Sequence, residues 1–141
     1  MTLKVQKVRP EAQLPVYAHP GDAGLDIRAA LAAQIPSGER VAVATGLALE
    51  LPQGTVVLVW DKIGRALKQG LKTMAGVIDA GFRGEFLVVL LNTSDQVVKI
   101  EPGDKIAQLL IQPVNQVEVE EVTSVADSTR GQGGFGSTGL Q

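Results

Sequence analysis

The chain has 141 residues, a formal net charge of −2, a single histidine and no cysteine. This length fits one domain, and 45% hydrophobic with 20% charged residues argues against general disorder. The missing cysteines exclude disulfides and thiolate metal sites, and there is no net basic charge to attract nucleic acid. No apolar run approaches the roughly 18 residues of a membrane helix, and the N-terminus lacks the apolar core of a signal peptide. We therefore expect a soluble, cytoplasmic protein with no nucleic-acid or membrane partner.

Short β-type segments separated by turns follow one another along the chain. Residues 3–8 alternate polar and apolar side chains, as a half-buried strand does. Turns that contain proline and glycine recur between the segments. Only residues 64–70 look helical, as a short turn that Asp61 would cap. The pattern predicts an all-β jelly-roll sandwich with one short helix. The further expected strands are 39–43, 47–51, 55–60, 85–91, 97–100, 106–112 and 117–122.

The composition changes near residue 123. Residues 1–122 are expected to form the β domain, and residues 123–141 a flexible, glycine-rich arm that buries too little apolar surface to order itself. Glycines of the arm match G-x-G-x-x-G, but no strand leads into them and no room remains for a helix, so a dinucleotide fingerprint is excluded. A strip of this kind can instead wrap phosphates with its backbone N–H groups, helped by the guanidinium of Arg130. Phe135, an isolated aromatic residue, would suit a nucleobase.

Three other segments hold residues that chemistry could use, each with a plain alternative. Asp79 follows an apolar triplet and is either a turn residue or a general base for water. Phe82 either packs in the core or forms one wall of a sugar pocket. Asp26, between two apolar residues, is either a hydrogen-bond hub or a group facing a metal. Gln108 has the position of an ordinary residue in an alternating strand.

Taken in order, these segments resemble the motifs of the trimeric dUTPase family. Residues 23–30 are similar to its first motif, 76–85 to its third, 103–109 to its fourth and 130–139 to its fifth. The fourth has Lys105 where arginine is usual. The resemblance covers essentially the whole chain, and the third and fifth motifs together are highly specific.

The resemblance implies a jelly roll assembled as a homotrimer, in which the arm of one chain closes over a site built by the others. It implies hydrolysis of dUTP to dUMP and pyrophosphate with Mg²⁺. Asp79 would orient or deprotonate the water that attacks the α-phosphorus, and Asp26 would reach the metal through water. Phe82, where the family usually has tyrosine, would lie beneath deoxyribose, and main chain between residues 73 and 87 would recognise uracil. The implied nucleotide-binding residues are Lys62, Ile63, Gly64, Thr73, Val77, Ile78, Phe82, Leu87, Gln108, Arg130, Phe135, Gly136, Ser137 and Thr138.

The second motif departs from the family pattern Pro-Arg-Ser-Gly-Leu-Ala. Here residues 61–66 are Asp-Lys-Ile-Gly-Arg-Ala, so Ile63 replaces serine and Arg65 replaces leucine. Ile63 has no hydroxyl to donate to a phosphate. Two hypotheses follow: an enzyme in which Arg65 supplies compensating charge, or a nucleotide-binding homologue with impaired catalysis. A dCTP deaminase, which shares the fold, is disfavoured because residues 86–91 hold no carboxylate and Val89 stands where that chemistry needs glutamate.

Overall fold

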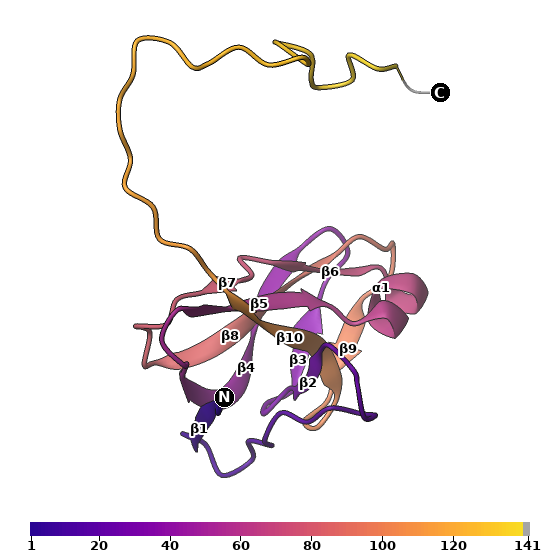
Figure 1. Ribbon diagram of the computed structural model, residues 1–141. Helices are drawn as coiled ribbons and strands as arrows, with labels where there is room; N and C mark the ends of the chain where they lie inside the picture. Colours follow the sequence, from indigo (N-terminus) through magenta and orange to yellow (C-terminus); the bar gives the residue numbers. More distant parts are fainter. Residues whose placement is uncertain (140–141) are drawn as a thin grey trace.

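The computed structural model describes residues 1–139, and in them the chain forms ten strands and one short helix (Figure 1). The helix α1 spans Ile63–Gln69, and no helix of residues 1–139 is long and apolar enough to cross a membrane. The strands are β1 (Lys4–Lys7), β2 (Leu25–Arg28), β3 (Ala33–Ile35), β4 (Arg40–Glu50), β5 (Thr55–Asp61), β6 (Leu71–Met74), β7 (Val77–Ile78), β8 (Glu85–Asn92), β9 (Val98–Ile100) and β10 (Lys105–Pro113).

Eight of these strands build two antiparallel four-stranded sheets. One has the order β1-β4-β8-β6 and the other the order β2-β10-β5-β7, while β3 and β9 form a separate pair. The order is not sequential, so neighbouring strands come from distant parts of the chain, as in a jelly roll. The predicted all-β jelly-roll class with one short helix is confirmed.

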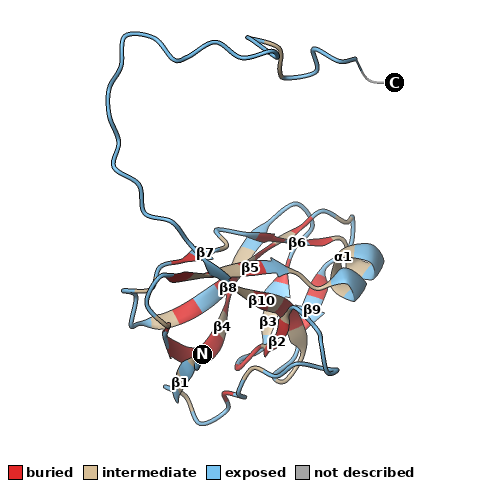
Figure 2. Ribbon diagram, in the orientation of Figure 1, coloured by how far each residue is buried: buried red, intermediate tan, exposed pale blue. Residues whose placement is uncertain are grey.

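The core lies between the sheets, and in strands such as β5, β6 and β8 buried residues alternate with more exposed ones (Figure 2). In β8, for example, Phe86, Val88 and Leu90 are buried while Leu87 between them is 46% exposed. Other fully buried side chains of the core are Ile27, Ile35, Val43, Leu47, Val57, Ile100, Ile106 and Leu109.

The predicted strands 39–43 and 47–51 are joined in one strand, β4. The register against β8 shifts between Ala44 and Ala48, which is where Gly46 takes a φ of 68°. A side chain at Gly46 would also meet Ala12, because an added Cβ would lie 2.7 Å from the Ala12 methyl group. Gly46, which lies between the two predicted strands, is therefore part of a bulge within one strand.

Two further expectations need correction. The helix begins at Ile63, but Asp61 does not cap it: Lys62 is the N-cap and no side chain caps that end. Residues 117–122 form no strand, although their sequence alternates. They lead away from the sandwich (Figure 1), and Val117 and Val119 are 77% and 89% exposed. A strand needs a neighbour for its backbone hydrogen bonds, and in the described chain this segment has none.

Candidate functional site

Asp26 lies at the centre of an ionic cluster. Its side chain is only 2% exposed, and Lys62 pairs with its Oδ1 while Lys105 Nζ lies 2.7 Å from its Oδ2. Burial alone would raise the pKa of Asp26, but the two ammonium groups outweigh it and the pKa lies below its usual value. Asp26 is therefore a charged anchor that joins β2 to the residue before α1 and to the first residue of β10. This favours the hydrogen-bond hub over a group free to bind a metal.

Gln108 lies beside this cluster on β10. Its Nε2 donates to the backbone oxygen of Asp61, 2.9 Å away, and its Oε1 lies so close to Gly24 that any side chain there would collide with it. The Asp61 carboxylate accepts hydrogen bonds from both the backbone N–H and the hydroxyl of Thr73, at 2.6 and 2.7 Å, and pairs with Lys72. Both the hydroxyl and the backbone N–H of Thr73 are thus engaged within the chain.

Asp79 lies at the end of β7 and lines a hollow. The residue is exposed, and within residues 1–139 its carboxylate makes no hydrogen bond or ion pair. The hollow has a volume of about 580 Å³ and is also lined by Thr55 and Gln116. A carboxylate that is exposed, without a protein partner and beside a hollow of this size is available to act on a bound molecule or on water. These features favour the general-base hypothesis over a turn residue alone.

The other residues of the predicted uracil and sugar region lie on β7, on β8 and in the loop between them. Val77 is 66% exposed, whereas Ile78 points into the core and offers only its backbone. Phe82 is 46% exposed and its ring lies against Gly84, so the side chain is not part of the core. Leu87 is a half-exposed residue of β8. The loop between β7 and β8 therefore presents one ring, one carboxylate and free backbone to solvent.

Ile63 and Gly64 lie at the start of α1, beside another hollow, which we call the basic hollow. This hollow, of about 390 Å³, is lined by Lys62, Gly64, Arg65, Lys68, Gln69 and Lys105, so its rim is strongly basic. Ile63 is 75% exposed and has no place in the core. A basic hollow beside an exposed apolar residue matches an anion-binding site from which one polar donor is missing.

The arm carries the remaining predicted residues, and it stands away from the sandwich (Figure 1). The last hydrogen bond between the C-terminal part of the chain and the sandwich runs from the N–H of Val114 to the oxygen of Gly54. The hydrogen bonds of residues 115–139 are all made within that segment. Arg130 donates through Nε to the oxygen of Gly133, and Phe135 is fully exposed. Gly136, Ser137 and Thr138 form a turn of their own.

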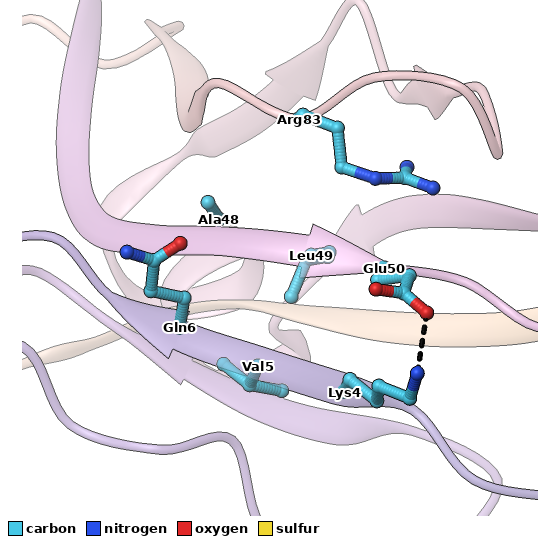
Figure 3. A pocket seen from close by; sticks show the side chains of 7 residues that line it. All are labelled: Lys4, Val5, Gln6, Ala48, Leu49, Glu50 and Arg83. Carbon is cyan, nitrogen blue, oxygen red and sulfur yellow. Dashed lines mark hydrogen bonds and ion pairs between the residues drawn. The ribbon is translucent and has the colours of Figure 1, made fainter.

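A smaller hollow between β1, β4 and Arg83 is lined by none of the predicted site residues (Figure 3). Lys4 and Glu50 form an ion pair of 2.6 Å across the strands, and Lys4 is the main cause that lowers the pKa of Glu50. This is an exposed surface pair, a kind that contributes little to stability.

The structure therefore brings some predicted residues together and keeps others apart. Asp26, Lys62 and Gln108 share one cluster, and Asp79 lies with Val77 at a separate hollow that has no lining residue in common with the basic one. Sequence reasoning missed Thr55 and Gln116, which line the Asp79 hollow, because nothing in their local sequence marks them. It also missed that Lys105 and Arg65 tie the cluster together, although both stood out as departures from a family pattern.

Comparison with known proteins finds relatives over nearly the whole chain. The dUTPase family model matches residues 10–139. The deoxyuridine 5'-triphosphate nucleotidohydrolase of Gloeothece citriformis is 47% identical over 99% of this chain and 98% of its own length. The enzyme of that name from Clostridium tetani is 41% identical over 98% of this chain and 97% of its own.

Solved structures show the same architecture. The Staphylococcus bacteriophage 80alpha dUTPase with dUpNHpp superposes with a TM-score of 0.92 at 29% identity, covering 99% of both chains. A mutant dUTPase from phage phi11 of S. aureus, described with a coordinated structural Mg(II) ion, superposes with a TM-score of 0.81 at 28% identity, covering 88% of this chain and 98% of that one.

Proposed function

This chain belongs to the dUTPase family, and we propose that it hydrolyses dUTP to dUMP and pyrophosphate. The observation that carries the proposal is the carboxylate of Asp79 at its hollow, which has no partner in residues 1–139, in a chain that matches the family model over residues 10–139. Asp79 orients the attacking water and takes its proton, so that the water reaches the α-phosphorus as a nucleophile. The bond to the bridging oxygen then breaks, and pyrophosphate leaves.

Substrate recognition is divided among the remaining predicted residues. Backbone groups between residues 73 and 87 recognise the uracil edge, and the ring of Phe82 lies against deoxyribose, where a 2′-hydroxyl has no room. The phosphates are held by Lys62 and Gln108 together with three residues of the arm, Arg130, Ser137 and Thr138. Phe135, which has no partner of its own in the described chain, covers the base.

A homotrimer completes this site. In a single chain the basic hollow, the Asp79 hollow and the arm are three separate parts, and a nucleotide needs all of them. The sheet faces that point away from the core also carry exposed apolar residues: Trp60, Met74, Val77 and Leu87 are 40–66% exposed. Association of copies would bury these faces and bring parts from different chains together.

Mg²⁺ belongs to the proposed reaction as the ion that accompanies the triphosphate, because Mg²⁺ keeps its waters and binds phosphates with few carboxylates. Residues of the chain do not fit a direct ligand set. Both oxygens of Asp26 pair with lysines, and residues 1–139 contain no group of three His, Cys, Asp or Glu side chains placed to hold a metal. No step is therefore assigned to the metal, and Asp26 serves to hold the two lysines.

The second candidate is a homologue that binds dUTP without efficient turnover. The observation that favours it is Ile63, which is 75% exposed between two residues that line the basic hollow, Lys62 and Gly64, and which has no hydrogen-bond donor in its side chain. Deamination of dCTP is disfavoured because the side chains of Phe86–Leu91 in β8 are all aliphatic or aromatic.

Pyrophosphate release from dUTP, measured with and without Mg²⁺, separates these alternatives, with dCTP and dTTP as competing substrates. We expect release from dUTP, and a fall in turnover of about 10²–10⁴ in Asp79→Asn, because asparagine keeps the shape but cannot accept the proton. Binding of the non-hydrolysable dUpNHpp should change little in this variant. Binding without any release by the parent protein would establish the impaired homologue, and parental turnover by Asp79→Asn would make Asp79 a turn residue.

A further inference from the structure

Helix α1 is not fixed to the sandwich by hydrophobic burial. It spans only Ile63–Gln69, none of its residues is buried, and no side chain caps its first turn. A helix this short has little stability of its own, so contacts with its surroundings must decide where it lies.

Arg65 supplies such contacts. Its Nη2 lies 2.9 Å from Oδ2 of Asp104, its Nε donates to the backbone oxygen of Lys105 at 3.0 Å, and its Nη1 donates to Oε1 of Gln69 at 2.8 Å. The side chain is 20% exposed. A planar guanidinium can satisfy acceptors on two elements at once, which a lysine amine cannot do in the same geometry. Arg65 thus fastens the helix to the turn that begins β10.

This fastening reaches the proposed phosphate site. Lys105, whose backbone Arg65 holds, pairs with Asp26, and so does Lys62 immediately before the helix. Gln108 lies three residues further along β10. Apart from the residues of the arm, the residues that would hold the triphosphate therefore come from the start of α1 and from β10, and Arg65 joins these two elements directly.

The contacts also decide between two roles for Arg65. If its charge replaced a missing donor to the phosphates, most of its five N–H groups should be free of acceptors within the chain. Instead Nε, Nη1 and Nη2 each have an acceptor within the chain, and one of them is the carboxylate of Asp104. Burial alone would raise the pKa of Asp104, but the N–H of Glu101 and the Arg65 guanidinium outweigh it, so this carboxylate is charged at neutral pH.

We propose that Arg65 is a positioning residue for dUTP hydrolysis: it holds residues 62–64 in register with β10 so that both meet the same triphosphate. The proposal rests on the proposed function. It assigns to Arg65 no contact with substrate, and it explains how a chain with arginine at this position keeps its second motif in place.

The test uses Arg65→Met, Arg65→Lys, Asp104→Asn and the double variant Arg65→Met/Asp104→Asn in the full chain. We expect Arg65→Met to lower kcat/KM for dUTP about tenfold, since small displacements of binding groups are costly in rate. Asp104→Asn should lower it in the same direction, and the double variant should be no worse than Arg65→Met, because both changes break one contact. Arg65→Lys should recover part of the loss.

Stability and a matched control distinguish positioning from general damage. The melting temperature of Arg65→Met should stay close to the parental value, because the helix contributes nothing to the core. Arg40→Met removes the same side chain from an exposed position with no ion pair in residues 1–139, and should leave kcat/KM unchanged. Parental kcat/KM in Arg65→Met would overturn the proposal. An equal loss of kcat/KM in Arg65→Met and Arg65→Lys, together with parental kcat/KM in Asp104→Asn, would also overturn it. That result would indicate direct contact between Arg65 and substrate.

The parent protein provides the separate check on the proposed function. If the parent neither releases pyrophosphate nor binds dUpNHpp, the proposed function fails, and the role of Arg65 fails with it. If the parent binds the analogue without turnover, positioning is measured as affinity: Arg65→Met should weaken dUpNHpp binding about tenfold, and unchanged affinity would overturn the proposal.

Discussion

Ile63 is the residue at which this chain departs most consequentially from its family. The side chain is 75% exposed beside a hollow lined by Lys62, Arg65, Lys68 and Lys105. Phosphate oxygens need hydrogen-bond donors where charge develops during cleavage, and an aliphatic group removes water from them without replacing its hydrogen bonds. With the positioning role proposed above, Arg65 does not fill the gap: three of its five N–H groups are engaged by Asp104, Lys105 and Gln69, which directs the guanidinium toward β10.

Ile63→Ser should therefore raise the turnover of dUTP. In other enzymes, loss of one preorganised hydrogen-bond donor lowers kcat about 10²–10³-fold. We expect the serine hydroxyl to raise kcat about tenfold. Affinity for dUpNHpp should change less, since the lysines and the arm remain. Steady-state kinetics at saturating Mg²⁺ measures the change, with Leu67→Ser, at an 82% exposed position of the same helix, as the control. An unchanged or lower kcat in Ile63→Ser alone would show that position 63 does not face the phosphates.

At the scale of elements, Glu85 explains why β4 can bend where it does. Its carboxylate accepts the N–H of Gly46 at 2.9 Å and pairs with Arg9 through Nε at 2.8 and 3.1 Å. One side chain at the start of β8 thus stabilises the bulge of β4 and the segment that follows β1. The Arg9 hydrogen bond is the main cause that lowers the pKa of Glu85, and burial opposes it. Glu85, at the end of the third motif, has a structural role.

The stability that Glu85 contributes should depend on pH. Because its pKa is lower in the folded than in the unfolded state, where it is about 4.3, the contribution is present above about pH 5 and is lost as the pH falls through the folded-state value. Glu85→Gln should cost about 1 kcal/mol in the free energy of unfolding at pH 7, and this cost should shrink below about pH 4. Urea unfolding at fixed protein concentration measures it. Glu50→Gln, which breaks an exposed pair, should change less, and an equal effect of both substitutions would contradict this role.

Sequence patterns predicted the elements whose burial follows a simple period. The expected strands at 55–60, 85–91 and 106–112 match β5, β8 and β10, and the helix begins within one residue of its predicted start. The short strand β2 was not predicted, because Leu25, Asp26 and Ile27 are all buried and no alternation is visible. The segment 117–122 has the alternation but no neighbouring strand, which a local pattern cannot reveal.

The candidate site shows the same division. Asp79 and Phe82 could be predicted because their local sequence fits a known motif, and the structure places both at an exposed loop. The pairing of Asp26 with Lys62 and Lys105, which lie far along the chain from it, could not be predicted, because it depends on how β2, α1 and β10 pack. Long-range pairing of charges is a property of the fold and leaves no periodic trace in the sequence.

At the scale of the whole molecule, the separation of the arm from both hollows makes the assembly testable. Light scattering at micromolar concentration should give about three times the chain mass of 14.8 kDa. A monomer mass would contradict a shared site, because in a single chain the Asp79 hollow, the basic hollow and the arm lie apart.

Mixed trimers test whether the parts come from different chains. Asp79→Asn lacks the base, and a chain without residues 129–141 lacks Arg130 and Phe135, so each should be inactive alone. If Asp79 and the arm of one site belong to different chains, random co-assembly of equal amounts should restore about one quarter of the sites. In those sites the truncated chain supplies Asp79 and the Asp79→Asn chain supplies the arm. Co-expression followed by pyrophosphate release measures the recovery. If one chain supplied both parts, no mixture could form an intact site, and activity would stay at the level of the two inactive parents.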